Sequence, residues 1–259
     1  MIKMPVIEVT AVPAFSDNYI WLITSGGNSC AVVDPGDAQP VLEVLQEKGL
    51  DLAYILITHH HPDHIGGMRR LQELTGAEVF GPHDPRISGQ RRMVAEDEIV
   101  GLPTLRLEFR ILEVPGHTSS HIAFFGHGCL FCGDTLFSVG CGRLFEGSPE
   151  EMQDSMDKLA GLPAETQVYC GHEYTLSNCR FALAVEPENE HLIRRNREVE
   201  AHRAAGLVTI PSNLGEELMV NPFLRCRQAS VVAAAQKRKP GVQAGAGTLA
   251  VIRAWKDNF

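Results

Sequence analysis

The segment Thr58-His59-His60-His61-Pro62-Asp63-His64 is the strongest indication of the architecture and chemistry that we expect of this chain. It closes Ala53–Thr58, a continuous apolar run of strand length that indicates a strand covered on both faces. Side chains two positions apart on an extended segment point the same way. His59 and His61 can therefore share one metal ion.

The residues that follow predict a second ion beside the first. Pro62 cannot continue a strand ladder and should turn the chain, so that Asp63 and His64 face a neighbouring position. Gly66-Gly67 permits close backbone approach at the start of the next helix. Burying so many imidazoles without a metal would leave polar nitrogens unpaired, at about 1–3 kcal/mol each. Metal binding is the better interpretation of this segment.

Three further candidate ligands each follow a glycine at the end of a predicted strand. They are His117 in Pro115–Thr118, Asp134 in Cys132–Thr135 and His172 in Gly171–Tyr174. Loop residues collect over a layered α/β scaffold at such strand ends. Each of the three would be weak evidence alone, and together they complete a set of metal ligands.

Composition restricts the classes of partner. The chain has 259 residues, of which 44% are hydrophobic and 21% charged, as in an ordinary globular protein with a sizeable core. Its formal net charge of −9 argues against a nucleic-acid partner. We find no secretory signal and no apolar run of membrane-spanning length, so we expect a cytoplasmic protein without a membrane partner. Arg86, Arg91 and Arg92 are expected in a solvated loop.

Cysteine usage agrees with a reducing compartment. The seven cysteines are odd in number and scattered, which favours reduced thiols over a disulfide framework. Cys129 and Cys132 form a C-x-x-C, but no second pair is spaced to complete a zinc site. We therefore expect these two residues to be small buried side chains beside a strand.

The pattern along the chain predicts two parts. The first two-thirds alternates short β-rich runs with helical patterns, and Ser148-Pro149-Glu150-Glu151 marks a helix start with an N-cap and a glutamate three residues later. From about Glu173 strands disappear, and three ranges are predicted as helices: Tyr174–Val185, Glu188–Ala205 and Arg227–Lys237. We expect an α/β domain at residues 1–172 and a smaller α-helical domain at residues 173–259.

At this point the sequence resembles a known family. The segments T-H-H-H-x-D-H, G-H-T, G-D-T, G-H-E-Y-T and N-P-F-L-R occur in the order found in glyoxalase II enzymes, the hydroxyacylglutathione hydrolases of the metallo-β-lactamase superfamily. The first half of this pattern is specific only for the superfamily. The second half narrows the resemblance from the superfamily to the glyoxalase II enzymes. It consists of Gly171–Thr175, Val185–Asn189, Asn221–Phe223 and Arg253–Phe259.

The resemblance implies a fold and a set of ligands. The fold would be an αβ/βα metallo-β-lactamase sandwich followed by the helical domain. Two divalent metal ions would be bound, most simply zinc, with iron or manganese as alternatives that histidine and aspartate ligands suit equally. His60 would not be a ligand, and its ring should turn away into other hydrogen bonds. The implied ligands are His59, His61 and His117 for the first ion, Asp63, His64 and His172 for the second, and Asp134 as the bridge.

The implied activity is hydrolysis of the thioester of S-D-lactoylglutathione, and of related S-2-hydroxyacylglutathiones, to D-lactate and glutathione. A hydroxide that bridges the metals would attack, with Asp63 and Asp134 as the catalytic carboxylates; this would be the second step of methylglyoxal detoxification. The glutathione carboxylates need cations and hydrogen-bond donors, and the implied substrate-binding residues are Arg143, Phe145, Tyr174, Arg253 and Lys256. Some relatives have Lys and Tyr where Arg143 and Phe145 stand, so Phe145 lacks a hydroxyl donor.

Several alternatives stay open. The nearest rival is a mononuclear-iron glutathione persulfide dioxygenase of the same superfamily, and another superfamily hydrolase, such as a nuclease or a β-lactamase, is a further one. A non-enzymatic hypothesis is a binding module with structural metals, although structural zinc sites are usually rich in cysteine. We expect a monomer that takes a small-molecule glutathione thioester.

Overall fold

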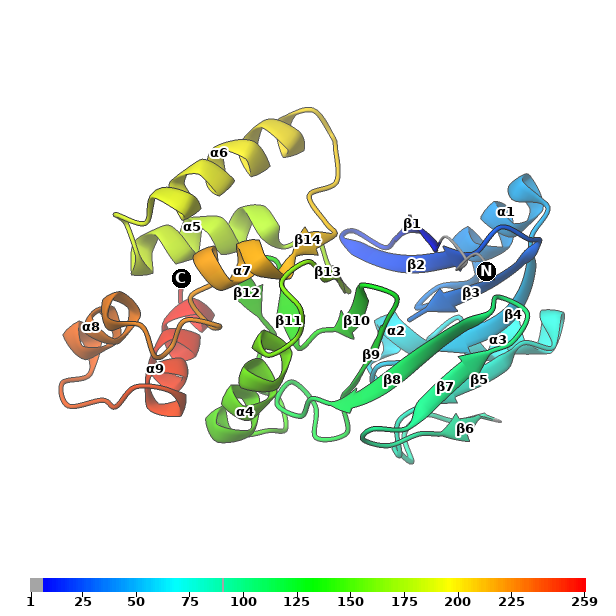
Figure 1. Cartoon of the computed structure of the whole chain (residues 1–259), viewed down its shortest axis with the longest axis horizontal. Helices are drawn as coiled ribbons and strands as arrows, with labels where there is room; N and C mark the ends of the chain where they lie inside the picture. The colour runs from blue at the N-terminus through cyan, green and yellow to red at the C-terminus, as the bar shows by residue number, and fades with distance from the viewer. Residues whose placement is uncertain (1–6, 90) are drawn as a thin grey trace, which may run out of the picture. The chain divides into compact units, whose positions relative to one another are not determined.

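A computed structural model describes residues 7–89 and 91–259, and the chain divides into two compact units (Figure 1). The first unit takes in residues 1–113 and 120–133, and the second takes in residues 114–119 and 134–259. The predicted division into domains at residues 1–172 and 173–259 stays a prediction, because compactness divides the chain at other points.

The first unit contains a sheet in which six strands follow one another in chain order. They are β1 (Glu8–Ala14), β2 (Asn18–Thr24), β3 (Ser29–Val33), β4 (Asp51–Leu56), β5 (Glu78–Gly81) and β6 (Arg92–Met93). The first two pairings are antiparallel and the other three are parallel. The central position of β4 accounts for the apolar run in the sequence, although the strand begins and ends two residues earlier than Ala53–Thr58.

Helices cover one face of this sheet. They are α1 (Ala38–Lys48) and α3 (Met68–Thr75), with the short α2 (Pro62–Ile65) between them along the chain. Val41 of α1 and Leu71 of α3 are buried with Val32 and Ile55 of the strands in one apolar cluster. The carboxylate of Asp37 accepts a hydrogen bond from the backbone of Gln39 at 2.9 Å and so caps α1.

A second sheet lies against the other face of the first sheet, away from the helices. Its strands in this unit are β7 (Ile99–Leu102), β8 (Leu107–Glu113), β9 (Ile122–Gly126) and β10 (Cys129–Gly133), each antiparallel to the next. Tyr54, which points away from the helices, bonds through its hydroxyl group with Thr104 at 3.2 Å. Cys129 and Cys132 are buried in β10 as free thiols, which confirms the prediction for the C-x-x-C pair.

The second unit is mainly helical. It contains the hairpin of β11 (Leu136–Phe137) and β12 (Gly140–Cys141), the antiparallel pair of β13 (Gln167–Cys170) and β14 (Ser212–Asn213), and the helices α4 (Pro149–Ala160), α5 (Thr175–Val185), α6 (Glu190–Ala204), α7 (Leu214–Val220), α8 (Ala229–Arg238) and α9 (Ala246–Asp257). Three helices lie within two residues of the predicted ranges. The expectation that strands end before Glu173 is wrong, since β14 lies beyond it, and α7 and α9 were not predicted.

Local sequence explains where two of these helices begin. The Ser148 hydroxyl accepts from the Glu151 backbone at 3.1 Å, and the Glu151 carboxylate accepts in return from the Ser148 backbone at 2.7 Å. This capping box was predicted and is confirmed. Asn189 caps α6 by accepting from the Leu192 backbone at 3.2 Å. In Figure 1, α5 and α6 run alongside each other, joined by a buried cluster that includes Ala182 and Val199.

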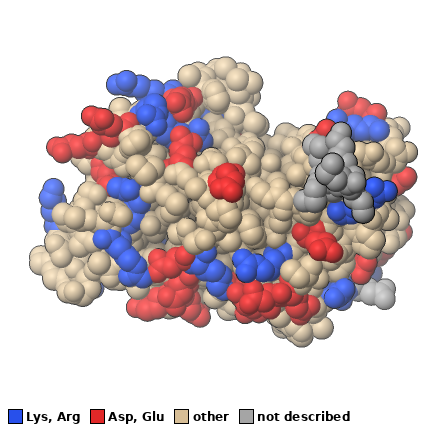
Figure 2. Space-filling view, in the orientation of Figure 1, with Lys and Arg blue, Asp and Glu red and all other residues tan. Residues whose placement is uncertain are grey.

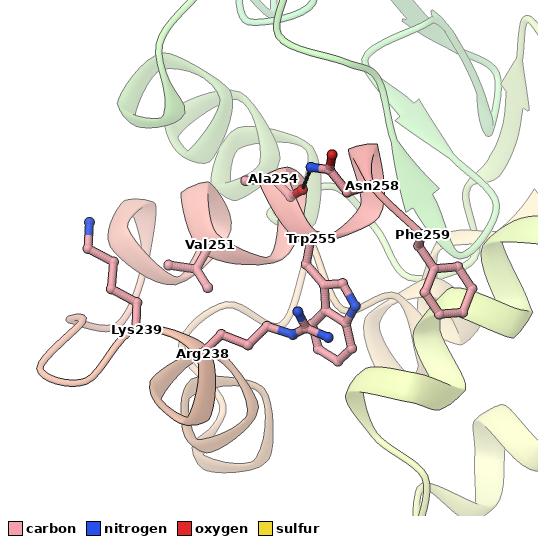
Figure 3. A pocket seen from close by; sticks show the side chains of 7 residues that line it. All are labelled: Arg238, Lys239, Val251, Ala254, Trp255, Asn258 and Phe259. Carbon is pink, nitrogen blue, oxygen red and sulfur yellow. Dashed lines mark hydrogen bonds between the residues drawn. The ribbon is translucent and has the colours of Figure 1, made fainter.

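A cation–π contact joins α8 to α9. Figure 3 shows the Arg238 side chain lying over the indole of Trp255, and its guanidinium carbon is 3.5 Å from the ring centroid. The hollow beside this contact is lined by Lys239, Val251 and Phe259, among others. Arg238 therefore helps to hold the last helix of the chain.

The surface view and the helix lengths bear on partners. On the face in Figure 2, acidic and basic side chains are interspersed, so that face carries no broad basic field. Within residues 7–89 and 91–259, every helix is too short or too polar to pass through a bilayer. The expectation of no nucleic-acid partner stays a prediction.

Candidate metal centre

Two ligand candidates of the first unit are already paired. His59 and His61 follow β4, and His59 Nε2 lies 3.1 Å from His61 Nδ1. Two nitrogens on one tetrahedral zinc ion, each about 2.0–2.1 Å from the metal, would be separated by roughly 3.3 Å. The observed distance therefore fits two lone pairs that converge on one divalent ion. Sequence spacing predicted this pairing.

A buried carboxylate behind these rings sets their protonation. Asp34, at the end of β3, accepts from the Thr58 backbone at 2.8 Å and from the Thr58 hydroxyl at 2.6 Å. Because that hydroxyl donates to Asp34, its oxygen can accept from His59 Nδ1, which lies 3.0 Å away. The proton of His59 is thereby fixed on Nδ1. Its Nε2 atom keeps the lone pair that a metal needs.

The same carboxylate orients a third ligand candidate. His64 Nδ1 lies 3.0 Å from Asp34 Oδ2, and a carboxylate can only accept, so Nδ1 carries the proton. His64 Nε2 is then the atom available to a metal, and it lies 3.5 Å from Asp63 Oδ2. Asp34, His59 and His64 are all buried, so these hydrogen bonds are shielded from water. Asp34 was not predicted, because no local pattern in the sequence marks it.

Asp63 is held in place by a residue that sequence reasoning also missed. The Asn18 amide donates to Asp63 Oδ2 at 3.0 Å, from the start of β2. Gly36 lies against this segment so closely that a Cβ atom there would be 1.8 Å from the Asp63 carbonyl oxygen. A Cβ on Gly66 would likewise be 2.5 Å from the Gly36 carbonyl oxygen. The predicted close backbone approach at Gly66 is thus confirmed.

The His60 ring faces Asp84 and also meets the His61 ring, with centroids 4.8 Å apart. Its Nδ1 lies 3.4 Å from Asp84 Oδ2, and Asp84 also accepts a pair of bonds from Arg86 at 2.8 and 2.7 Å. Burial alone would raise the pKa of Asp84, but hydrogen bonds from Arg86 and Ser120 outweigh it and hold that pKa well below its usual range. His60 therefore faces a carboxylate that stays ionised.

Arg86 and Arg92 are exposed, in agreement with the expected solvated loop, whereas Arg91 is half-buried. Arg91 donates to the carbonyl oxygens of Asp84 and Ile87, and the Arg92 guanidinium lies over the Phe80 ring at 5.8 Å. With Arg86 bound to Asp84, all three are anchored. The buried Asp84 carboxylate holds Arg86, and main-chain carbonyls hold Arg91, in the loop beside His60.

A further histidine packs on the first unit's ligands. His121 is buried, and its ring stacks on that of His59 with centroids 4.5 Å apart. Gly133, at φ +46°, makes room for this stack, because a Cβ there would be 2.3 Å from the Thr58 hydroxyl and 2.9 Å from the His121 ring. The glycine before Asp134 is thus required by packing.

In the second unit, two predicted histidine ligands lie against the carboxylate of a third predicted ligand, Asp134. Asp134 Oδ2 lies 3.2 Å from His172 Nε2 and 3.6 Å from His117 Nε2. His117 Nδ1 lies 2.8 Å from the carbonyl oxygen of Arg143, which accepts its proton and leaves Nε2 to bind a metal. All three ligands are buried. This arrangement fits a carboxylate shared between divalent ions.

The predicted substrate-binding residues differ in exposure. The side chain of Arg143 is 65% exposed, and Phe145 is also exposed, with its ring 5.3 Å from that of His117. Tyr174 stacks on His172, with ring centroids 4.7 Å apart. Arg253 is only 4% exposed and donates to the carbonyl oxygen of Cys141 at 2.8 Å. Direct binding of substrate by Arg253 stays a prediction.

Lys256 is the other predicted cation on α9. Its ammonium donates to the Asn178 side chain, and it lies 5.7 Å from the Phe181 ring centroid. Burial, aided by the nearby Arg253, lowers the pKa of Lys256 to about 8. Asp257 partners Arg253 at 3.1 Å and Arg143 at 3.6 Å. Two arginines thus share the Asp257 carboxylate, which leaves positive charge available to an anionic ligand.

Comparisons with known proteins define the class first. The family model described as metallo-beta-lactamase superfamily matches residues 14–172, and the one described as hydroxyacylglutathione hydrolase C-terminus matches residues 173–259. Among solved structures, ETHE1 from Myxococcus xanthus is similar with a TM-score of 0.65 at 23% identity, covering 97% of this chain and 98% of its own. A protein solved in a di-iron-bound form has a TM-score of 0.60 at 25% identity, covering 83% of this chain and 99% of its own. The expected fold class is confirmed.

Sequence relatives then narrow the class to one family. A hydroxyacylglutathione hydrolase of Photobacterium profundum is 52% identical, covering 98% of this chain and 100% of its own, and one of Pseudomonas fluorescens is 50% identical with the same coverage. The chain belongs to the hydroxyacylglutathione hydrolase family of the metallo-beta-lactamase superfamily. The family predicted from the motifs is confirmed, and the histidine and aspartate clusters suit divalent metal ions.

Proposed function

We propose that this protein hydrolyses the thioester of S-D-lactoylglutathione, and of related S-2-hydroxyacylglutathiones, to D-lactate and glutathione. The observation that carries this proposal is the identity of about half of all residues, along nearly the whole chain, with proteins named hydroxyacylglutathione hydrolase. The metal-ligand clusters of both units support it, because this hydrolysis needs an activated water molecule.

The proposal includes a centre of two divalent ions. His59, His61 and His117 would hold one ion, Asp63, His64 and His172 the other, and Asp134 would bridge them. Support comes from the 3.1 Å between His59 Nε2 and His61 Nδ1, and from Asp134 Oδ2 at 3.2 and 3.6 Å from two Nε2 atoms. Zinc is the proposed metal, with iron and manganese as the alternatives.

Such ions lower the pKa of water to about 7 and act as Lewis acids toward a carbonyl oxygen, which supplies both nucleophile and electrophile at neutral pH. The protein's own groups fix the ligands that make this chemistry available. Asp34 holds the protons of the His59 and His64 rings on Nδ1, directly for His64 and through Thr58 for His59. Asn18 fixes Asp63. The leaving thiolate has a conjugate acid of pKa about 8.5, so a dedicated general acid is less necessary.

Glutathione carries two carboxylates, and the proposed site offers cations for them. Arg143 is exposed and can move to a ligand, while Lys256 is partly desolvated, which strengthens its attraction to an anion. Arg253 holds the Cys141 carbonyl and Asp257. Tyr174 and Phe145 would flank the substrate through their rings, Tyr174 beside His172 and Phe145 beside His117.

The deciding experiment is an absorbance assay of S-D-lactoylglutathione hydrolysis by metal-replete protein, with a thioester that lacks glutathione as control. Turnover of the glutathione thioester at a kcat/KM at least about 100-fold above the control is expected. Absence of turnover with both metal sites filled would reject the proposal. Oxygen consumption on glutathione persulfide, in the same preparation, would instead identify the iron dioxygenase.

The proposed setting is a cytoplasmic monomer. All seven cysteines are free and buried, which suits a reducing compartment. Sedimentation of the metal-loaded protein at micromolar concentration should give a mass near 28.4 kDa.

A further inference from the structure

The turn that joins β11 to β12 is buried, which is unusual for a connection between strands. Ser138 and Val139 are at most 1% exposed, and Phe137 is 5% exposed. Val139 has a φ of +57°, in the left-handed region that a β-branched residue rarely adopts. A buried turn must find partners for its backbone polar groups, and a strained one must be held by its surroundings.

Side chains from the helical part of the same unit supply those partners. Glu217 Oε2, on α7, accepts from the Val139 backbone at 2.7 Å. Asn221 Nδ2 lies 3.1 Å from Glu217 Oε2, 3.1 Å from the Phe137 carbonyl oxygen and 3.0 Å from that of Gly140, so it spans both ends of the turn. The Asn178 amide donates to the Ser138 carbonyl at 2.9 Å.

The turn in turn contacts the metal-ligand region. The edge of the Phe137 ring lies against Tyr174 and His172, with centroids 5.3 and 5.9 Å apart. His172 reaches Asp134, three residues before Phe137, at 3.2 Å. The position of Phe137 therefore limits where the His172 ring can stand. A shift of the turn would move the Phe137 ring, and the His172 ring would lose that packing contact.

We propose that Glu217 is a positioning residue for the metal centre, and that it acts by holding the strained Phe137–Gly140 turn whose Phe137 ring packs on His172. The proposal deepens the proposed function, on which it rests. Glu217 touches neither metal ligand nor substrate in this arrangement; it works through the turn. Burial raises the pKa of Glu217, while hydrogen bonds from Val139 and others oppose that rise. The helical segment thus supports catalysis besides binding substrate.

Chelator competition for Zn²⁺ on the apo-protein, without substrate, tests this inference separately from hydrolysis. Glu217→Leu should weaken the second of the two zinc affinities about tenfold, because changing the supports of a ligating histidine typically has effects of 10–100-fold. Glu217→Gln keeps an acceptor oxygen of the same length and should stay within about twofold of wild type. Glu217→Asp, which draws the oxygen back by one methylene, should fall between them.

Glu186→Leu is the matched control. Glu186 is also buried in the helical segment, but it accepts from Arg225 at 2.9 and 3.0 Å and from Ser230, away from the turn. It should lower thermal stability while leaving zinc affinity unchanged. Equal loss of zinc affinity in Glu186→Leu and Glu217→Leu would overturn the inference, since both effects would then be general destabilisation.

Val139→Gly provides a rescue. Glycine adopts φ +57° without steric strain, so the turn needs less support. Added to Glu217→Leu, it should restore zinc affinity at least about threefold. Should Glu217→Leu fail to fold, the zinc affinities of the other two variants test the inference. Glu217→Gln should bind zinc more tightly than Glu217→Asp, and equal affinities would reject the inference. Wild-type protein that binds two zinc ions but hydrolyses no thioester would reject the proposed function alone.

Discussion

Asp34→Asn should damage the metal centre without touching a metal ligand. Asp34 is 4% exposed and accepts three hydrogen bonds, of 2.8, 2.6 and 3.0 Å, from the Thr58 backbone, the Thr58 hydroxyl and His64 Nδ1. Asparagine keeps an acceptor for the Thr58 backbone. Its amide, placed at Oδ2, turns a donor toward His64 Nδ1, which must then lose its proton. The proton moves to Nε2, the atom that we propose as the metal ligand.

The magnitude follows from the bonds that change. Hydrogen bonds to a charged group contribute about 1.5–3 kcal/mol each, and two of the three are reversed in the variant, with partial recovery as the Thr58 hydroxyl rotates. Because the Thr58 hydroxyl also supports His59 at 3.0 Å, two ligands are affected. We expect metal affinity to fall roughly 100-fold, or about 2.7 kcal/mol.

Competition with a chromogenic chelator measures this loss directly. Asp37→Ala is the control, because Asp37 lies nearby in the same loop and caps α1, so its loss should reduce stability by about 1 kcal/mol with unchanged metal affinity. If folded Asp34→Asn protein binds zinc as tightly as wild type, Asp34 does not control which nitrogen of His64 carries the proton.

Two further predictions concern other supports of the site. Asn18→Ala removes the 3.0 Å bond to Asp63 and should lower kcat/KM about tenfold, with KM nearly constant; steady-state kinetics showing the loss entirely in KM would contradict it. Burial lowers the pKa of Lys256 to about 8, so its positive charge disappears as pH rises through 8, and KM for the glutathione thioester should rise above that pH. A pH profile of KM that is the same in wild type and Lys256→Ala would exclude this role.

Local signals in the sequence predicted the candidate ligands but not the residues that orient them. The His59–His64 segment shows its chemistry because its members are adjacent in sequence, and Ser148 with Glu151 shows a capping box for the same reason. Asp34 and Asn18 act on residues 24 to 45 positions away in the chain. Only the pairing of β3 with β4, and the placing of β2 beside them, bring those side chains to the ligands.

In the second unit too, contacts between residues far apart in sequence decide which side chains are buried. Arg253 lies near the end of the chain and was predicted to face a substrate carboxylate, yet its guanidinium bonds to a carbonyl 112 residues away. Helix α9 was not predicted as an element, because Gly247 in its first turn weakens the helical pattern and packing on α4 and α8 has to compensate. Strand β14 has two residues and carries no sequence signal.

A titration of metal-free protein with zinc tests whether hydrolysis needs two metal ions, with bound metal and hydrolysis of S-D-lactoylglutathione measured on the same samples. Bound zinc should saturate at two ions per chain, and turnover should follow occupancy of the second ion. Full turnover at one ion per chain, or no turnover at two, would contradict this expectation.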